Sequence, residues 1–445
     1  MNKIYNKWLM CATVLLAGSS FVACDDQPDK FEMTDGVPTV KYVRVTDPTK
    51  ADSLLTGAYL QNTICLVGDN LRSIHEMYFN DQKAILNTSL ITDHTLIVSI
   101  PKNIPTTVTD KIYMITRDGE TVEYDFNVKV PNPVVSSMNN EWAKAGSEAV
   151  LYGQYFVDDA NNPIQIIMPG NIPVPHDNIV SVTQNEVRFV VPQEASDATG
   201  QIDVRTMYGL GRSAFHFHDQ RGMMFTFDEG SLLLQGWKAL EPKSDEFSIA
   251  GNYIQLGDGT TELTDEDNWK DGINFLEYWA GTWGEGFPKS GQGMLLTDLV
   301  DFTDWQNMSL KFEMSIPSSN PWKSIDMQIM FASPEQLSLD NASWNFFNGG
   351  DLSGDDKAKA MSPRAIYRPW LTTGSFDTKD EWITVTIPLN SLIYDYDAKP
   401  TANPISDPSY FGSLQICICG IGGLKNERPC SPIVRIDNIR AVQNL

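Results

Sequence analysis

The sequence has few cysteines, little positive charge and no long apolar run after its first 23 residues. Six cysteines occur in 445 residues, and their spacing does not match the ligand pattern of a zinc site. Lys and Arg number 33 against 57 Asp and Glu, which gives a formal net charge of -24. Such a charge opposes the binding of nucleic acid or anionic lipid headgroups and favours a neutral ligand.

The sequence also lacks the motifs of common enzyme classes. It has no nucleophile elbow, phosphate-binding loop, metalloprotease helix or dinucleotide fingerprint, and its five histidines do not form a ligand set. Acidic residues are so abundant that a pair of carboxylates suited to glycoside hydrolysis could always be chosen. We therefore expect a protein that binds a ligand without catalysis and without a cofactor, apart from the structural calcium ion considered below.

The N-terminus has the three zones of a secretory signal. Lys3 and Lys7 precede an apolar run over residues 8–17, which is too short to span a bilayer comfortably, and small residues follow. The run leads to Cys24 in a segment that resembles the lipobox of bacterial lipoproteins, and the acidic pair after it is similar to the surface-export signal of Bacteroidetes. This resemblance implies that Cys24 is lipidated and holds the protein on the outer membrane, at the cell surface.

Short alternating strands separated by turn residues fill residues 37–131 and again residues 132–219. The two segments align by eye, with Gly68 of the first matching Gly153 of the second. A repeat of roughly 90 residues marks tandem domains rather than a solenoid. Both segments resemble IPT/TIG domains, which implies two immunoglobulin-like sandwiches. Pro131 and Pro133 predict a stiff junction between them.

Residues 220–445 differ in composition, because nine of the ten tryptophans after residue 23 lie there and only Trp142 precedes them. Long alternating strands with long polar loops predict a jelly-roll-like β-sandwich. Its opening strand (225–229), penultimate strand (381–389) and closing strand (436–439) resemble those of carbohydrate-binding jelly rolls. With the lipobox and the tandem repeat, the chain resembles surface glycan-binding proteins of the B type, which carry a C-terminal xyloglucan-binding domain. The predicted fold is all-β, with residues 1–23 a signal peptide and 24–36 a tether.

Aromatic residues in the loops of the last domain are the candidates for binding. A sugar ring has apolar C–H faces and a rim of hydroxyls, so its site needs flat aromatic surface bordered by polar side chains. We predict that the leading residues that stack on the glycan are Trp322, Trp344 and Trp370, followed by Trp279, Trp283 and Tyr367. Trp305 and Trp382 adjoin regular strands and are predicted to lie in the core.

Several alternatives stay open at this stage. A surface adhesin for protein and a glycosidase are the competing functions, and β-glucan, xyloglucan and mannan offer similar ring faces. The resemblance to jelly-roll glycan binders implies a structural calcium ion, for which Asp228, Glu229 and Asp437 could supply oxygen ligands, with surface acidity as the alternative. An outer-membrane glycan importer is a further expected partner. Buried free thiols are favoured for Cys65, Cys417, Cys419 and Cys430 over a disulfide that involves Cys430.

Overall fold

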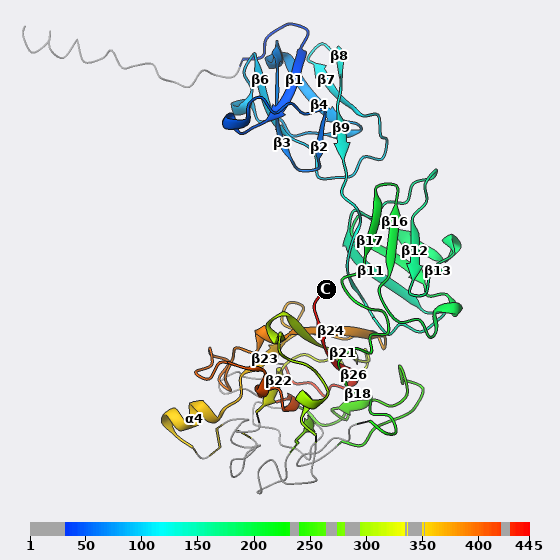
Figure 1. The fold of residues 1–445 in the computed structure, drawn as a ribbon, viewed down its shortest axis with the longest axis vertical. Coiled ribbons are helices and arrows are strands. Elements are labelled where there is room, and N and C mark those ends of the chain that lie inside the picture. Colours follow the sequence, from blue (N-terminus) through cyan, green and yellow to red (C-terminus); the bar gives the residue numbers. More distant parts are fainter. Residues whose placement is uncertain are drawn as a thin grey trace, which may run out of the picture. The chain divides into compact units, whose positions relative to one another are not determined.

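The computed structural model describes residues 32–231, 240–263, 274–280, 294–333, 336, 349–350, 352–419 and 428–445. The chain divides into two compact units, residues 1–131 and 132–445. Strands dominate both units, and the α-helix α4 (Gly354–Ala360) lies in the second one. The predicted fold class, two immunoglobulin-like sandwiches followed by a larger β-sandwich, is confirmed (Figure 1).

The first unit is a sandwich of a three-stranded sheet, ordered β1-β3-β6, and a four-stranded sheet, ordered β5-β4-β7-β8. A short parallel pair, β2-β9, completes it. Its strands are β1 (Thr39–Val45), β2 (Gly57–Tyr59), β3 (Thr63–Asp69), β4 (Ile74–Phe79), β5 (Gln82–Lys83), β6 (Thr95–Ser99), β7 (Lys111–Thr116), β8 (Thr121–Asp125) and β9 (Asn127–Lys129). Its 3-10 turns are η1 (Pro48–Lys50), η2 (Leu71–Ser73) and η3 (Thr88–Leu90). Buried and more exposed residues alternate along β7, in agreement with the short alternating strands that the sequence predicts for residues 37–131.

A second sandwich repeats this plan with sheets ordered β10-β11-β15-β14 and β13-β12-β16-β17. Its strands are β10 (Val134–Met138), β11 (Glu148–Gln154), β12 (Gln165–Met168), β13 (Ile172–Pro173), β14 (Ile179–Val182), β15 (Glu186–Val190), β16 (Asp203–Thr206) and β17 (Gly209–Arg212). The turns η4 (His176–Asn178) and η5 (Gln193–Ala195) connect them. Phe189, Leu151 and Ile166 are completely buried between the sheets.

The matched glycines Gly68 and Gly153 have the same structural role in the two sandwiches. Each lies opposite the first strand of its domain, next to a β-bulge at which the register shifts. A side chain at Gly68 would clash with the carbonyl oxygen of Thr39, and one at Gly153 would clash with that of Val134. The repeat therefore preserves a site where two backbones approach too closely for a Cβ atom.

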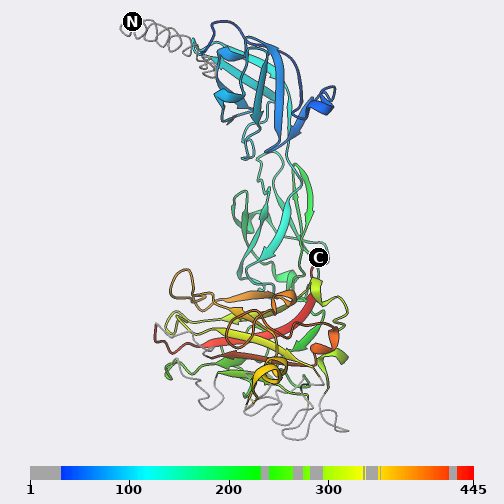
Figure 2. The ribbon, with the colours of Figure 1, turned by 90° about the vertical axis from the view of Figure 1, so that its left-hand side faces the viewer.

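The C-terminal sandwich stacks two antiparallel sheets, and Figure 2 shows them as layers. One sheet is ordered β18-β26-β21-β24, with β19 also paired to β26; the other is ordered β20-β25-β22-β23. The strands are β18 (Met223–Phe225), β19 (Ile254–Leu256), β20 (Phe275–Tyr278), β21 (Met308–Ser315), β22 (Met327–Ala332), β23 (Arg364–Tyr367), β24 (Trp382–Pro388), β25 (Ser413–Ile418) and β26 (Val434–Gln443). Its 3-10 turns are η6 (Leu296–Asp298), η7 (Trp305–Asn307), η8 (Leu389–Ser391) and η9 (Pro408–Tyr410).

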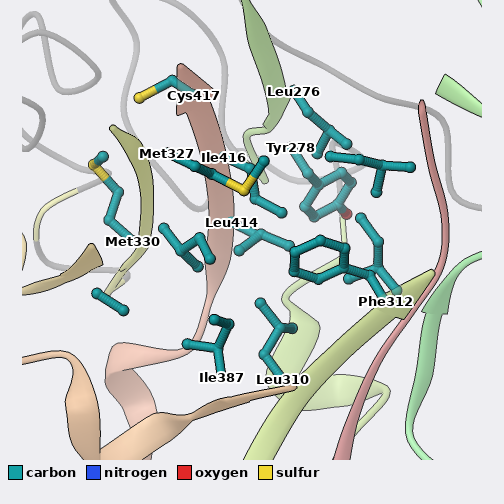
Figure 3. Close-up of a cluster of buried hydrophobic side chains, with 14 of the residues drawn as sticks. Leu276, Tyr278, Leu310, Phe312, Met327, Met330, Ile387, Leu414, Ile416 and Cys417 are labelled. Carbon is teal, nitrogen blue, oxygen red and sulfur yellow. The ribbon is translucent and has the colours of Figure 1, made fainter. Parts of the chain in front are cut away.

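Large apolar side chains from both sheets fill the space between the layers (Figure 3). Leu310 and Phe312 of one sheet and Leu414 and Ile416 of the other are completely or almost completely buried. Each such side chain contributes roughly 1.5–3 kcal/mol of hydrophobic stabilisation. The four cysteines within the described residues, Cys65, Cys417, Cys419 and Cys430, are buried and unbridged, as predicted.

The second sandwich docks on the outer face of the sheet that contains β21, β24 and β26. Strand alternation turns Lys311 and Glu313 of β21 away from the core residues Leu310 and Phe312. A loop of the second sandwich, residues 139–144, lies against this outer face. The backbone N–H of Thr384 donates to Asn139 O (2.8 Å), and the N–H of Glu141 donates to Thr384 Oγ1 (2.7 Å).

Four buried charges close this contact, and we call Glu141, Lys311, Glu313 and Arg440 the Glu141 ion cluster. The Glu141 carboxylate accepts from Lys311 Nζ (2.5 Å) and from Arg440 Nη2 (2.8 Å). The Arg440 guanidinium also binds both oxygens of Glu313, at 2.8 and 3.0 Å. Burial alone would lower the pKa of Arg440, but the two carboxylates raise it above its ordinary value. Two cations and two anions balance, so the second sandwich supplies a charge that the last sandwich needs.

Candidate functional site

Two of the predicted aromatic residues, Tyr367 and Trp370, lie together where strand β23 ends. Both are half-buried and pack against the core of the C-terminal sandwich with part of each side chain open. Arg368 stands between them in the sequence and is half-buried as well. We call Tyr367, Arg368 and Trp370 the Tyr367 platform.

The carbonyl of Ile325 fixes the tryptophan of this platform. Trp370 Nε1 donates to Ile325 O (3.2 Å), and Trp322 Nε1 donates to the same oxygen (2.9 Å). Ile325 has a φ of 67°, a left-handed conformation that is rare for a β-branched residue. Such backbone strain costs roughly 1–3 kcal/mol and clusters at functional sites, where the surrounding structure holds it in place. The strained residue therefore sets the orientation of Trp370.

An ion pair fixes the arginine of the platform. Arg368 Nε and Nη2 donate to the two carboxylate oxygens of Asp326, at 2.6 and 2.8 Å. The Asp326 side chain is 4% exposed and that of Arg368 is 26% exposed. Two-point pairing of this kind restricts the guanidinium to one plane, while its remaining N–H groups can meet an incoming hydroxyl.

The tyrosine of the platform rests on the core. Its ring lies 6.2 Å from that of Trp322 at an angle of 54°, and burial raises the pKa of the Tyr367 hydroxyl to about 12. The hydroxyl is therefore protonated at any physiological pH. Two aromatic surfaces and a fixed guanidinium are what a neutral sugar ring and its hydroxyls require.

The structure contradicts the prediction that Trp322 and Trp279 stack on the glycan, because both are buried. Trp322 is 0% exposed and forms a backbone bridge with Phe376, so its ring supports the platform from below and has no face for a sugar. Trp279, directly after β20, is also buried in the core cluster, at 4% exposed.

Trp283 and Trp344 lie outside the described residues. Trp382 is buried, as predicted, but in a small cluster with Ile249 and Tyr253 that is separate from the main core, and Trp305 is half-buried at the margin of the main core.

Sequence reasoning missed the residues that hold the platform in place. Asp326 and Ile325 precede strand β22, more than forty residues from the side chains that they hold, and no local pattern marks them. Tyr367 was predicted to lie in a loop, but it ends strand β23, which the sequence analysis did not identify. The available signal was the arginine itself, because it sits between two aromatic residues.

The region expected to bind calcium contains one unusual carboxylate. Asp437 is completely buried, and its Oδ2 atom has no hydrogen-bond partner. Burial, reinforced by the nearby charges of Glu313 and Asp228, raises the pKa of Asp437 to about 9. Asp228 is half-buried, while Glu229 is exposed. Among the described residues, no three His, Cys, Asp or Glu side chains gather as a metal site, so backbone oxygens would have to complete the ligand set.

The fold and the platform define a class, a β-sandwich with a half-buried aromatic surface that follows immunoglobulin-like domains in the chain. Residues 217–443 match the family described as surface glycan-binding protein B xyloglucan binding domain. The crystal structure of a surface glycan-binding protein from Prevotella bryantii is 41% identical, with a TM-score of 0.75, over 92% of this chain and 100% of that chain. This chain belongs to the surface glycan-binding protein B family.

A curated relative supports the assignment of the N-terminal sandwiches. An IPT/TIG domain-containing protein of Bacteroides ovatus is 26% identical over 168 residues, which are 36% of this chain and 33% of that protein. The match thus spans a third of the relative's length. Family membership implies a position at the cell surface. Within the described residues, no helix is long and apolar enough to cross a membrane, and Cys24 lies outside those residues.

Proposed function

We propose that this protein captures a neutral polysaccharide of the xyloglucan type at the cell surface, through the Tyr367 platform. The observation that carries the proposal is the joint fixation of Trp370 and Arg368 by two successive residues, Ile325 and Asp326. A site that is rigid before binding loses little side-chain entropy when the glycan arrives. The family match covers these residues and supports xyloglucan over the other neutral glycans considered.

Binding without cleavage is part of the proposal. Asp326, which lies beside the platform, is engaged by Arg368 through both carboxylate oxygens and so is poorly placed to act as an acid or base. The test is isothermal titration of the full chain with xyloglucan, β-glucan and mannan, followed by prolonged incubation. We expect tightest binding to xyloglucan and an unchanged polymer chain length. A fall in chain length would assign the protein to the glycosidases instead.

We propose further that a lipid on Cys24 anchors the protein in the outer membrane, near a glycan importer. The lipobox-like segment in the sequence supports this proposal. Cys24→Ala should move the protein from the membrane fraction to the soluble fraction, and pull-down of the parent should recover an importer component. Equal membrane fractionation of variant and parent would contradict the anchor.

Trp283 and Trp344 remain predicted glycan contacts, to be tested by Ala substitution in the isothermal titrations with xyloglucan.

A structural calcium ion at Asp228 and Asp437 also remains a proposal. The unpartnered Oδ2 of buried Asp437 suits an oxygen-seeking cation, whereas exposed Glu229 lacks such support. If the ion binds, a chelator should lower the melting temperature of the parent and leave Asp437→Asn unaffected. An identical melting curve of the parent with and without chelator would remove the proposal.

A further inference from the structure

A pocket of about 450 Å³ opens where the second sandwich meets the C-terminal sandwich. This volume falls in the range of roughly 300–1,000 Å³ that is usual for small-molecule sites. Residues of the segments 142–145, 196–199 and 218–220 line the pocket on one side. The loop containing Ile249 and Ala250 lines it on the other. All of these residues belong to one compact unit.

The walls of the pocket are held by specific contacts between the two sandwiches. Lys144 Nζ donates to Ser248 O (2.7 Å), and Trp142 packs against the buried cluster of Ile249, Tyr253 and Trp382. Glu141, which directly precedes Trp142, is held by the ion pairs of the Glu141 ion cluster. The pocket is therefore formed before any ligand arrives.

Aromatic surface lines this pocket. Trp142 is the one tryptophan between residue 24 and residue 219, and its half-buried ring lies 5.2 Å from that of His218. His218 in turn stacks on Phe217, with ring centroids 3.9 Å apart. Burial lowers the pKa of His218, so its imidazole is neutral at pH 7.

The polar side chains of the pocket suit a neutral, hydroxylated ligand. Ser196 and Thr199 supply hydroxyls, and Asp197 and Lys144 supply one charge of each sign. Because those charges offset each other and the histidine is neutral, the site has no net attraction for an ion. Flat aromatic surface bordered by hydroxyl, carboxylate and ammonium groups is the chemistry that recognises a sugar unit.

We infer that this junction pocket, lined by Trp142, Ser196, Asp197 and His218, is a second carbohydrate-binding site that contacts another segment of the same polysaccharide. The inference rests on the proposed function, since it assigns the same class of ligand. Two sites on one polymer raise the effective concentration of the second contact. The pocket should therefore strengthen binding of long chains more than binding of short ones.

The test uses the full chain and a xyloglucan oligosaccharide as the probe. Tyr367→Ala/Trp370→Ala removes the aromatic surface of the platform, and ligand-observed NMR then detects what the junction binds alone. We expect weak residual binding, which Ser196→Trp should reduce at least about tenfold by filling the pocket. Ser181→Trp, on an exposed serine of β14 that does not line the pocket, is the matched control and should retain the residual binding.

The outcomes separate this inference from the proposed function. With an intact platform, Ser196→Trp should weaken binding of long xyloglucan and leave the affinity for a short oligosaccharide unchanged. If the parent binds but the platform-deficient chain binds nothing, the junction site is wrong and the platform stands. If Ser196→Trp and Ser181→Trp reduce residual binding equally, the junction site is also wrong. A parent that binds no xyloglucan overturns both proposals.

Discussion

The Tyr367 platform and the Glu141 ion cluster each pair an arginine with a carboxylate on the C-terminal sandwich, but they differ in exposure. Arg368 of the platform is 26% exposed, whereas Arg440 and Glu313 of the cluster are 0% exposed. A half-open guanidinium keeps N–H groups for a ligand, while a closed one has all its charge matched within the protein. If the platform binds glycan as proposed, the same chemical pair binds a ligand at one place and joins two domains at another.

The largest expected effect comes from breaking the Glu141 ion cluster. Glu141→Ala leaves Lys311 and Arg440 short of a buried counter-charge, which should lower the free energy of unfolding by about 3–5 kcal/mol. Urea denaturation of the full chain measures this change. Glu148→Ala is the control, because the exposed Glu148–Arg188 pair should contribute less than about 1 kcal/mol. Equal losses in the two variants would contradict a docking role for the cluster.

Removing an aromatic ring from the open site should affect binding instead. Trp370→Ala should weaken xyloglucan binding by about 1–3 kcal/mol, or roughly 5- to 150-fold, because the stacked surface is lost. Trp305→Ala is the matched control, since Trp305 is also half-buried but packs against Phe411 at 5.8 Å. Titration calorimetry on variants with native circular dichroism decides the matter. Comparable losses of affinity in both would mean that the effect is structural.

Loosening the open ion pair should have a smaller effect. Asp326→Asn removes the charge that orients Arg368, and we expect xyloglucan affinity to fall roughly tenfold, the effect of about 1.4 kcal/mol. Asp301→Asn serves as the control, because within the described residues the exposed Asp301 carboxylate accepts only from Thr303 of its own turn. An Asp326→Asn chain that binds like the parent would show that Arg368 does not contact the glycan.

The stability of the C-terminal sandwich should also depend on pH, through the buried carboxyl group of Asp437. Its pKa is about 9 in the folded chain against 3.8 for an ordinary aspartate, so the folded state holds a proton that the unfolded state releases. Stability from this group is present at low pH and is lost as pH rises from about 4 towards 9, by up to about 1.4 kcal/mol per pH unit. Asp437→Asn should flatten that slope in denaturation curves without added calcium. Parallel pH profiles for variant and parent would exclude Asp437 as the cause.

The smallest effect concerns salt. Stacking and hydrogen bonds to a neutral ring are barely screened, so raising sodium chloride from about 50 to about 500 mM should change the dissociation constant less than about twofold. Titration calorimetry at both concentrations measures it. A tenfold loss of affinity would point to an anionic ligand held by charge.

Local pattern was enough to predict much of the fold. Alternating residues predicted short strands in residues 37–131 and 132–219 and long strands in the last domain, and the matched glycines Gly68 and Gly153 identified the repeat. Strand β23 escaped because its four residues include a buried arginine, Arg364, which breaks the apolar pattern.

The site was harder to predict because its geometry depends on contacts between distant segments. Trp370 is marked in the sequence by Arg368, which lies two residues before it. Trp322 follows Asn320 and Pro321, which predict an exposed loop, yet it pairs with Phe376, more than fifty residues away, and is buried. Nothing local to Asp326 shows that it binds Arg368. Pairings of this kind depend on how the strands associate, which the sequence pattern alone does not determine.

A crystal structure of the full chain with a bound xyloglucan oligosaccharide tests the central claim most directly. The account predicts a sugar ring against Tyr367 and Trp370, with the guanidinium of Arg368 within hydrogen-bond distance of a hydroxyl. An oligosaccharide bound elsewhere, with the Tyr367 platform empty, would contradict it.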